Sequence, residues 1–282
     1  MGGAVHPIEG DPVSDDTAST DLADLLELAT AVAVEAGELA LERRRAGVTV
    51  AATKSSIEDI VTEADREAEA LIRSRIDAAR PDDGFLGEEG NVAESRTGLT
   101  WVVDPIDGTV NYFYDRPAWS VSVALVEGDP WNGGRAVVGA VFNPVSGELF
   151  RASRGGGAWL GERRLRVNEG VALELALVAT GYAYKAETRI RQASIVEGVI
   201  GKVRDARRIG SAALELCDVA AGRTDVYYEN ELSPWDYAAG ALIVEEAGGR
   251  FDIHPSADMA FMVAGEAALG EQLRGLLVEL GQ

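Results

Sequence analysis

The segment Trp101–Tyr114, WVVDPIDGTVNYFY, joins an apolar run to two acidic residues and then to a Gly-Thr pair. Asp104 and Asp107 stand three positions apart, with Pro105 between them. Residues 87–115 hold one cation against six acids. An unpaired buried carboxylate is very costly. The acids of this apolar segment therefore need partners that the neighbouring sequence does not supply.

Length, composition and charge narrow the class of protein. The chain has 282 residues, of which 46% are hydrophobic, so one large or two modest globular domains are predicted. The net charge is −21, and nucleic acid and anionic lipid are bound mainly through Lys and Arg, so neither is an expected partner. No apolar run approaches the roughly 20 residues that span a bilayer, and the single Cys217 excludes an internal disulfide. Residues 1–20 lack the features of a secretory signal, so we predict a disordered tail there and a cytoplasmic protein.

Hydrophobic periodicity predicts a layered α/β fold. In the first half we expect helices followed by antiparallel strands: helices over 22–44 and 62–79, strands over 100–104 and 120–127, and a hairpin of 136–142 with 148–153. In the second half we expect strands over 175–180, 225–228 and 250–253 to alternate with helices over 187–203, 210–221, 235–247 and 266–280. This change of pattern predicts two halves, 21–165 and 166–282, in one sandwich.

Four acids mark the junctions between predicted elements, where functional side chains usually emerge. They are Glu88 in FLGEEG, Asp104 and Asp107 in DPIDGT, and Asp236 in SPWDYAAG. Mg²⁺ prefers such oxygen ligands, and two ions about 3.5–4 Å apart can clamp both oxygens of a phosphoryl transfer. The bend between Asp104 and Asp107 would also turn the carbonyl of Ile106 inward. The alternative is that these acids cap helices or pair with distant arginines.

The residues after Asp107 suggest an anion site. Gly108 allows close approach to the backbone, and a turn or helix that starts at Thr109 would offer free N–H groups to phosphate. Asp65 has two interpretations. It can cap the predicted helix over 62–79 as the last residue of the capping box TEAD. Alternatively, it accepts a hydrogen bond from Thr109, whose hydroxyl would then orient a water molecule for attack.

Four blocks of sequence resemble the inositol monophosphatase family. They are KSSIEDIVTEAD, GEEG, WVVDPIDGTVNYF and WDYAAGALIVEEAGG, in the order of that family and at its approximate spacing, across residues 22–265. The blocks that begin at Trp101 and Trp235 are specific, whereas GEEG alone is weak. The resemblance implies a five-layer αβαβα sugar-phosphatase fold and Mg²⁺-dependent, Li⁺-sensitive hydrolysis of a phosphate monoester. It also implies a homodimer.

The resemblance implies a metal-binding role for each matching acid. Glu88, Asp104 and the carbonyl of Ile106 would hold one metal ion, and Asp104, Asp107 and Asp236 would hold a second. Glu88 would also help to hold a weaker third ion. Two or three Mg²⁺ ions are therefore expected, with Mn²⁺ as a possible substitute.

The resemblance further implies the catalytic and phosphate-binding residues. Thr109, Asp65 and Glu88 would be catalytic, with Thr109 activating the attacking water and Asp65 supporting it. The amides of Gly108 and Thr109 would bind the phosphate. Lys54 matches a family position near the site.

The alcohol part of the substrate would contact Asp107, the segment Gly210, Ser211 and Ala212, and Glu229, by the same resemblance. A carboxylate accepts hydrogen bonds from neighbouring hydroxyls, which suits a polyol; the alternative for Glu229 is a solvated turn residue. The expected substrate is inositol monophosphate or a similar polyol phosphate. Fructose-1,6-bisphosphate, histidinol phosphate, 3′-phosphoadenosine phosphate and NADP remain alternatives. A non-catalytic partner protein is the alternative of another class.

Overall fold

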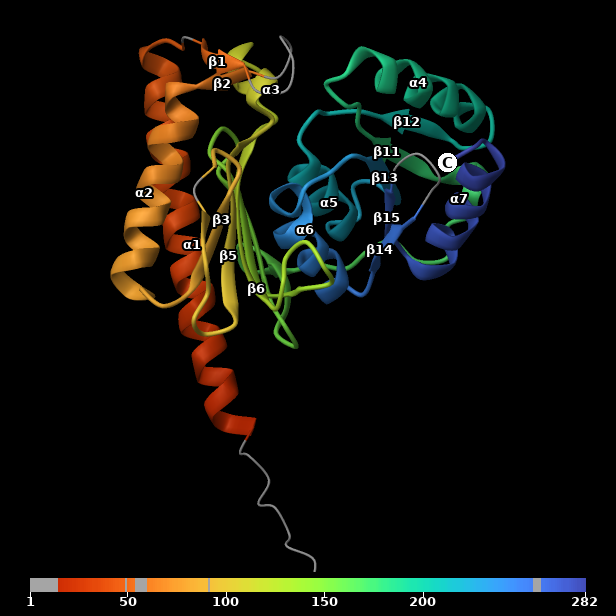
Figure 1. Ribbon diagram of the computed structural model, residues 1–282. Coiled ribbons are helices and arrows are strands. Elements are labelled where there is room, and N and C mark those ends of the chain that lie inside the picture. The colour runs from red at the N-terminus through yellow and green to blue at the C-terminus, as the bar shows by residue number, and fades with distance from the viewer. Residues whose placement is uncertain (1–14, 49, 54–59, 91, 256–259) are drawn as a thin grey trace, which may run out of the picture.

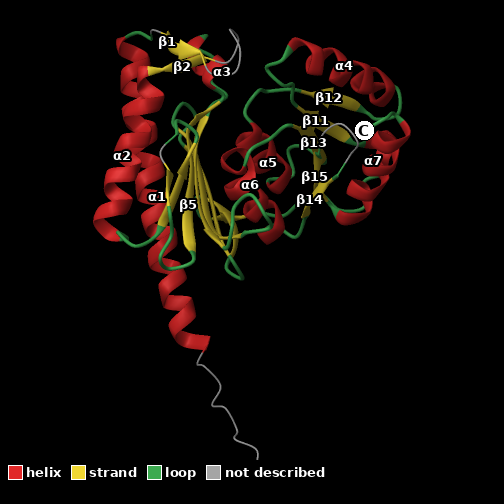
Figure 2. Ribbon diagram, in the orientation of Figure 1, coloured by secondary structure: helices red, strands yellow, loops and turns green. Residues whose placement is uncertain are grey.

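The chain folds into five layers, in the order helices, sheet, helices, sheet, helices, in the computed structural model (Figure 1). The structure describes residues 15–48, 50–53, 60–90, 92–255 and 260–282. The helices of the three helical layers are α1 (Asp15–Ala46) with α2 (Glu63–Ala79), α5 (Ala212–Ala220) with α6 (Pro234–Glu246), and α4 (Ala186–Ile200) with α7 (Ala267–Glu279). The two sheets separate these layers (Figure 2). The predicted five-layer fold is confirmed.

The larger sheet has eight strands in the order β10-β9-β8-β7-β6-β5-β3-β4. Their bounds are β3 (Gly84–Gly87), β4 (Val92–Ala93), β5 (Leu99–Asp107), β6 (Ser120–Glu127), β7 (Arg135–Asn143), β8 (Glu148–Ser153), β9 (Gly157–Leu160) and β10 (Arg163–Arg164). The expected antiparallel pairing holds throughout except between β3 and β5, which are parallel. The fully buried GFLG segment of β3 has no polar-apolar alternation that would have revealed it as a strand.

Strand β5 carries the segment WVVDPID through the interior of the molecule. Trp101 and Ile106 are fully buried in it. Its register with β6 shifts between Asp104 and Asp107, where Pro105 has no N–H to donate to the ladder. Irregularities of this kind re-aim side chains. Both aspartates therefore leave the regular alternation at the end of the strand, as the proline between them led us to expect.

The smaller sheet has five strands in the order β12-β11-β13-β15-β14. Their bounds are β11 (Leu177–Thr180), β12 (Asp205–Arg207), β13 (Val226–Asn230), β14 (Arg250–His254) and β15 (Phe261–Gly265). β11 pairs parallel with β12 and β13, and β15 pairs antiparallel with β13 and β14. β15 was not predicted, because FMVAG is buried on both faces and shows no alternation.

The central helices α5 and α6 pack against both sheets. One core cluster includes Val141 and Phe150 of the larger sheet, Tyr227 and Ala264 of the smaller one, and the buried residues of both helices. Gly240 lets the helices approach closely, because a Cβ there would lie 2.7 Å from the Leu216 side chain. Buried apolar surface contributes roughly 25 cal/mol per Å², so this shared layer stabilises both sheets.

The remaining elements are short. α3 (Thr109–Phe113) follows β5, a hairpin joins β1 (Val50–Thr53) to β2 (Ile60–Thr62), and a 3₁₀ turn covers Leu173–Leu175. α1 begins at Asp15, so the predicted disordered tail, residues 1–20, overlaps the first turns of this helix, and residues 1–14 lie outside the described residues. The division of the chain near residue 165 stays a prediction. Within the described part, none of the helices is both apolar enough and long enough to cross a bilayer.

Candidate active site and metal centre

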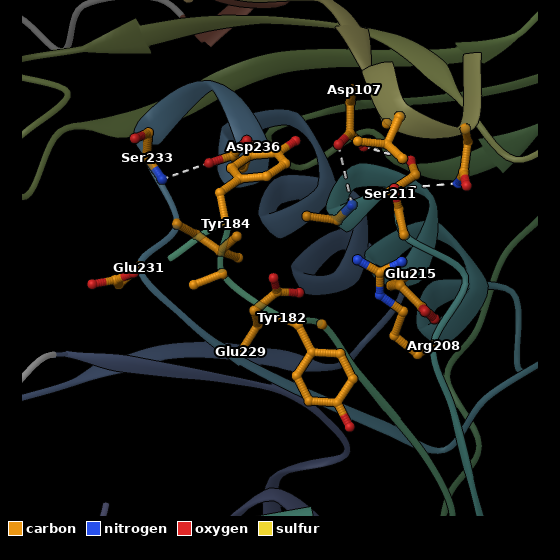
Figure 3. A pocket seen from close by; sticks show the side chains of 18 of the residues that line it. Asp107, Tyr182, Tyr184, Arg208, Ser211, Glu215, Glu229, Glu231, Ser233 and Asp236 are labelled. Carbon is orange, nitrogen blue, oxygen red and sulfur yellow. Dashed lines mark hydrogen bonds between the residues drawn. The ribbon is translucent and has the colours of Figure 1, made fainter. Parts of the chain in front are cut away.

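The ends of several elements line one cavity of about 880 Å³ (Figure 3). They are the junction of β5 with α3, the start of α5, the end of β13 and the start of α6. The predicted site residues that line the cavity are Glu88, Asp107, Gly108, Gly210, Ser211, Ala212, Glu229 and Asp236. Asp65, Asp104, Ile106 and Thr109 do not line it but are linked to it through the contacts below. Lys54 lies outside the described residues.

Three acids form the centre of the site. Asp104, Asp107 and Asp236 each offer a carboxylate oxygen within 4.8 Å of the other two. Burial and the charge of neighbouring acids raise the pKa of Asp104 and of Asp236 well above the ordinary value. Burial also raises the pKa of Asp107 to about 6. In the described part of the chain none of the three forms an ion pair, so the cluster concentrates negative charge that a cation would neutralise.

Local backbone groups hold two of these carboxylates. The N–H of Ile106 donates to Asp104 Oδ1 at 3.0 Å. The N–H of Ser233 donates to Asp236 Oδ2 at 2.6 Å, within the capping box that starts α6. Pro234 at the first turn suits this start, because its fixed φ is helical and it needs no hydrogen-bond acceptor there. Each aspartate thus sits where its own turn fixes it.

Asp107 is held from another part of the chain. Its carboxylate accepts hydrogen bonds from the hydroxyl of Ser211 at 2.5 Å and from the N–H groups of Ala212 and Ala213 at 3.2 and 2.8 Å. These groups form the start of α5, where free N–H groups and the helix dipole favour a carboxylate. Ser211 also caps the helix by accepting from the N–H of Leu214. The helix predicted from residue 210 therefore starts at Ala212, with Ser211 as its cap.

Glu88 lies beside the three aspartates, although it is not one of the three acids whose oxygens meet within 4.8 Å. It directly follows β3, and its N–H donates to the carbonyl of Val103 at 3.1 Å. Its charge contributes to the raised pKa of Asp104, Asp107 and Asp236. The donor set consists of oxygen atoms, which fits a hard cation such as Mg²⁺ rather than a thiolate- or imidazole-preferring metal.

Asp65 makes both of the contacts considered from the sequence, one that caps α2 and one with Thr109. Its Oδ2 accepts from the N–H and the hydroxyl of Thr62, at 2.8 and 2.5 Å, and so caps α2. Its Oδ1 accepts from the hydroxyl of Thr109 at 3.3 Å, and the same hydroxyl lies 3.0 Å from the carbonyl oxygen of Ile106. Burial raises the pKa of Asp65 to about 7, against the effect of the Thr62 hydrogen bonds.

The turn between β5 and α3 requires glycine. Gly108 has a φ of 93°, in the left-handed region. A Cβ there would lie 3.0 Å from the carbonyl oxygen of Gly210 and 3.1 Å from that of Ala118. Asn111 ties these segments together by donating to the carbonyls of Ala118 and Ile209 at 2.7 and 2.8 Å. Phosphate binding by the Gly108 and Thr109 amides stays a prediction.

Glu229 lies on β13 at the side of the cavity away from Asp107 and Asp236 (Figure 3), rather than in a solvated turn. Its Oε2 accepts from the hydroxyl of Tyr227 at 2.5 Å. Burial raises the pKa of Glu229 to about 7. Gly181 makes room for the carboxylate, because a Cβ at that position would lie 1.8 Å from Glu229 Oε2.

Several further side chains of the cavity were not predicted from the sequence, among them Tyr182, Arg208 and Glu215. Glu215 is buried on α5, where its Oε1 accepts from the N–H of Ile209 at 2.7 Å, and burial raises its pKa to about 8. An acid on the apolar face of AALELCDVA was the signal available for it. Tyr182 and Arg208 carry no comparable signal, because such residues occur on any protein surface.

Comparison with known proteins matches this geometry. The sequence profile described as Inositol monophosphatase family covers residues 21–275. The chain is 44% identical over 227 residues to Inositol-1-monophosphatase SuhB of Mycobacterium tuberculosis (strain H37Rv), with 77% of each chain covered. It is 36% identical over 258 residues to Nus factor SuhB of Xylella fastidiosa, with 87% of this chain and 91% of the relative covered. The crystal structure of extragenic suppressor protein suhB from Bartonella henselae superposes with a TM-score of 0.82 at 34% identity, over 90% of this chain and 98% of that one.

Proposed function

Since this chain belongs to the inositol monophosphatase family, and is thus a phosphatase of that type, we propose that it hydrolyses inositol monophosphate or a similar polyol phosphate with Mg²⁺. The observation that carries the proposal is the cluster of Asp104, Asp107 and Asp236 at one side of the cavity, within 4.8 Å of one another. The cavity continues from these acids to Glu229, so a phosphate at the cluster leaves room for its alcohol on the other side.

The proposed metal ligands divide into two sets. Glu88, Asp104 and the carbonyl of Ile106 hold one Mg²⁺ ion, and Asp104, Asp107 and Asp236 hold a second. Glu88 contributes to a weaker third site, and Mn²⁺ can replace Mg²⁺. When bound, these ions neutralise the charge of the phosphate and make a water molecule more acidic.

The protein's own groups orient the attack. The Thr109 hydroxyl has both Asp65 Oδ1 and the carbonyl oxygen of Ile106 as acceptors for its one hydrogen. In either case the lone pairs of Thr109 Oγ1 can accept a hydrogen bond from the attacking water and align it. The amides of Gly108 and Thr109 bind phosphate oxygens. Glu88 lies beside the three aspartates and completes the negative wall of the site.

The alcohol end of the proposed site combines donors and acceptors. The segment Gly210, Ser211 and Ala212 lies along one wall, where Asp107 is also held. Glu229 faces the same cavity and accepts hydrogen bonds from hydroxyl groups. Related phosphate esters, namely fructose-1,6-bisphosphate, histidinol phosphate, 3′-phosphoadenosine phosphate and NADP, are the competing substrates.

The test of the proposal is phosphate release from a panel of these esters, with and without Mg²⁺. We expect turnover that depends on Mg²⁺ or Mn²⁺, is inhibited by Li⁺ and is fastest on inositol monophosphate or another polyol monophosphate. A faster rate on a bisphosphate or a nucleotide would replace the substrate but keep the reaction. No metal-dependent release from any ester would refute the proposal.

The oligomeric state and location are part of the proposal. We propose a cytoplasmic homodimer, on the strength of the family alone. Light scattering of the purified protein should give twice the chain mass of 29.8 kDa. A mass of one chain at micromolar concentration would contradict the dimer, and cell fractionation tests the location.

A second role is favoured by one relative. The Xylella protein carries the name Nus factor SuhB rather than that of a phosphatase. The constellation of two buried aspartates and the half-buried Asp236 with Thr109 and Asp65 argues against a purely non-catalytic chain, because unpaired carboxylates are costly to retain without a ligand. Co-purification of a partner protein with this chain, undiminished in a metal-site variant, would establish a separate role.

A further inference from the structure

Two consecutive arginines, Arg207 at the end of β12 and Arg208 directly after it, have different surroundings. Arg207 pairs with Asp205 at 2.6 Å and donates to the carbonyl of Ala206 at 2.8 Å. Arg208 instead lines the cavity. In the part of the chain that the structure describes, Arg208 forms no hydrogen bond and no ion pair. Its guanidinium therefore keeps its five N–H donors for a ligand.

The guanidinium of Arg208 lies beside the predicted substrate segment, residues 210–212. Its Nη1 would lie 2.8 Å from a Cβ on Gly210, so it passes directly over that glycine. Its Cζ lies 6.0 Å from the ring centroid of Tyr182, within the range of a cation–π contact. Figure 3 shows Arg208, Tyr182 and Glu229 together on the side of the cavity opposite Asp107 and Asp236.

The charge of Arg208 acts on two carboxylates, those of Glu215 and Glu229. Burial raises the pKa of Glu215 to about 8 and that of Glu229 to about 7, and in both cases the positive charge of Arg208 works in the opposite direction. Glu215 is buried, and its Oε2 has no hydrogen-bond partner among the described residues. When Glu215 is ionised, its attraction keeps the guanidinium at this wall of the cavity.

We propose that Arg208 determines specificity by donating hydrogen bonds to hydroxyl oxygens of the substrate's polyol part, opposite Glu229, which accepts from its hydroxyl hydrogens. This inference rests on the proposed function, because it names the groups that recognise the alcohol. A hydroxyl is both a donor and an acceptor. A guanidinium donates to the hydroxyl oxygen, and a carboxylate accepts from the hydroxyl hydrogen. A wall with both groups therefore satisfies the hydroxyl as acceptor and as donor, which a carboxylate alone cannot do.

The charges at this wall favour hydroxyls over a second phosphate. One guanidinium stands near two glutamates, whose pKa values are about 8 and about 7. Where these glutamates are ionised, an ester that carried a second dianionic group here would meet carboxylates as well as the cation. A neutral polyol meets no such repulsion. Arg208 therefore selects polyol monophosphates against bisphosphates rather than recruiting them.

The experiment compares Arg208→Gln with Arg207→Gln, its exposed neighbour outside the cavity, in the full-length protein with Mg²⁺. Inositol 1-phosphate, p-nitrophenyl phosphate and fructose-1,6-bisphosphate serve as substrates. For Arg208→Gln we expect KM for inositol 1-phosphate to rise about 10- to 100-fold, as for loss of a charged hydrogen bond. We expect kcat for inositol 1-phosphate to stay within about twofold of wild type. The kcat and KM for p-nitrophenyl phosphate should also stay within about twofold, because this substrate has no hydroxyl group for Arg208 to bind. Arg207→Gln should behave as wild type.

Three outcomes would overturn the role of Arg208. They are an unchanged KM for inositol 1-phosphate, an equal loss on p-nitrophenyl phosphate, and a larger loss on fructose-1,6-bisphosphate, which would indicate a second phosphate site. Arg208→Lys keeps the charge and should recover part of the affinity, and it replaces the glutamine variant if that protein does not fold. If the wild-type protein releases no phosphate from any polyol phosphate, the proposed function fails instead, and the two failures are distinguishable.

Discussion

The hydroxyl oxygen of Thr109 lies 3.3 Å from Oδ1 of Asp65, although the two residues are 44 positions apart. The other oxygen of the same carboxylate caps α2 through Thr62. The start of an outer helix and a hydroxyl at the edge of the cavity are therefore fixed by one side chain. One oxygen of the carboxylate thus makes the structural contact, and the other makes the contact that we propose to be catalytic.

The Thr109 hydroxyl should be needed for turnover and not for folding. Thr109→Val keeps the shape of the side chain but removes the group that aligns water, so we expect kcat to fall about 100-fold or more, the usual contribution of such a group. Thr109→Ser should keep most of the activity. Steady-state kinetics with saturating Mg²⁺ measures both. A valine variant within about threefold of wild type would remove Thr109 from the mechanism.

The Thr62 contact should matter for stability and not for turnover. Thr62→Val removes the hydroxyl that donates to Asp65 Oδ2, and loss of a helix cap typically costs about 1 kcal/mol. We expect the free energy of unfolding in urea to fall by roughly that amount, with kcat within about twofold of wild type. Asp65→Asn, which removes the charge at both contacts, should reduce stability and activity together. Equal kinetic effects of the two substitutions would show that cap and site are not separable.

Removing one acid of the central cluster should abolish activity while sparing the metal-free fold. Asn at position 104 can still accept a hydrogen bond from the Ile106 N–H. Because it carries no charge, it avoids both the cost of burying a carboxylate and the repulsion by neighbouring acids, which raise the pKa of Asp104. We expect Asp104→Asn to lose at least about 100-fold in kcat/KM and most of the stabilisation by added Mg²⁺. Its melting temperature in EDTA should equal or exceed that of wild type. A clearly lower melting temperature in EDTA would mean that the carboxylate has a structural partner.

Gly181 should act on substrate binding through Glu229. An added Cβ would collide with the Glu229 carboxylate, and the flexible end of that side chain would move rather than the backbone. Gly181→Ala should therefore raise KM for a polyol phosphate as Glu229→Gln does, with kcat for p-nitrophenyl phosphate unchanged in both. The double variant should be no worse than either single one, because the two changes act on one contact. Additive losses would assign Gly181 a role of its own.

The metal-free protein should lose stability as the pH rises. Burial raises the folded-state pKa of Glu215 to about 8 and of Glu229 to about 7, above the ordinary 4.5. The folded state therefore holds protons that the unfolded chain releases, and the stability from these groups is present below pH 4.5 and lost as the pH rises through 7 and 8. Urea unfolding in EDTA at several pH values between about 6 and 8.5 measures this fall. Glu215→Gln should make it smaller, and a stability that rises with pH would contradict the assignment.

The sequence was sufficient for the elements with a clear period. The helices at 63–79 and 267–279 and the hairpin of β7 with β8 were predicted from spacing alone, with ends within a few residues. Eight strands of the described residues were not predicted: β1, β2, β3, β4, β9, β10, β12 and β15. Of these, β3, β9 and β15 are buried short runs or lie between glycines, so neither alternation nor length reveals them. Their partners are distant in sequence, and only the assembled sheets supply the pairing.

In the candidate site, too, residues with a local sequence pattern could be predicted, and residues that depend on distant contacts could not. Asp104 and Asp107 could be predicted because charged residues interrupt an apolar strand at a proline. The contact of Ser211 with Asp107 spans 104 positions, and no local pattern encodes it; only resemblance to a family suggested that 210–212 belongs to the site. Arg208 became apparent only from its position over Gly210, because nothing in RRIGSA distinguishes it from Arg207.

The central layer joins the two sheets through one continuous core. α6 is buried on the sides that face both sheets, and Leu216, Leu242 and Ile243 belong to a core that includes residues of both. Swinging one half away from the other would expose this layer to water. Substrate entry and product departure therefore depend on rim segments such as 181–185, which Gln192 of α4 fastens through the N–H of Ala183. We therefore expect loop motion, rather than closure of one half over the other, to accompany turnover.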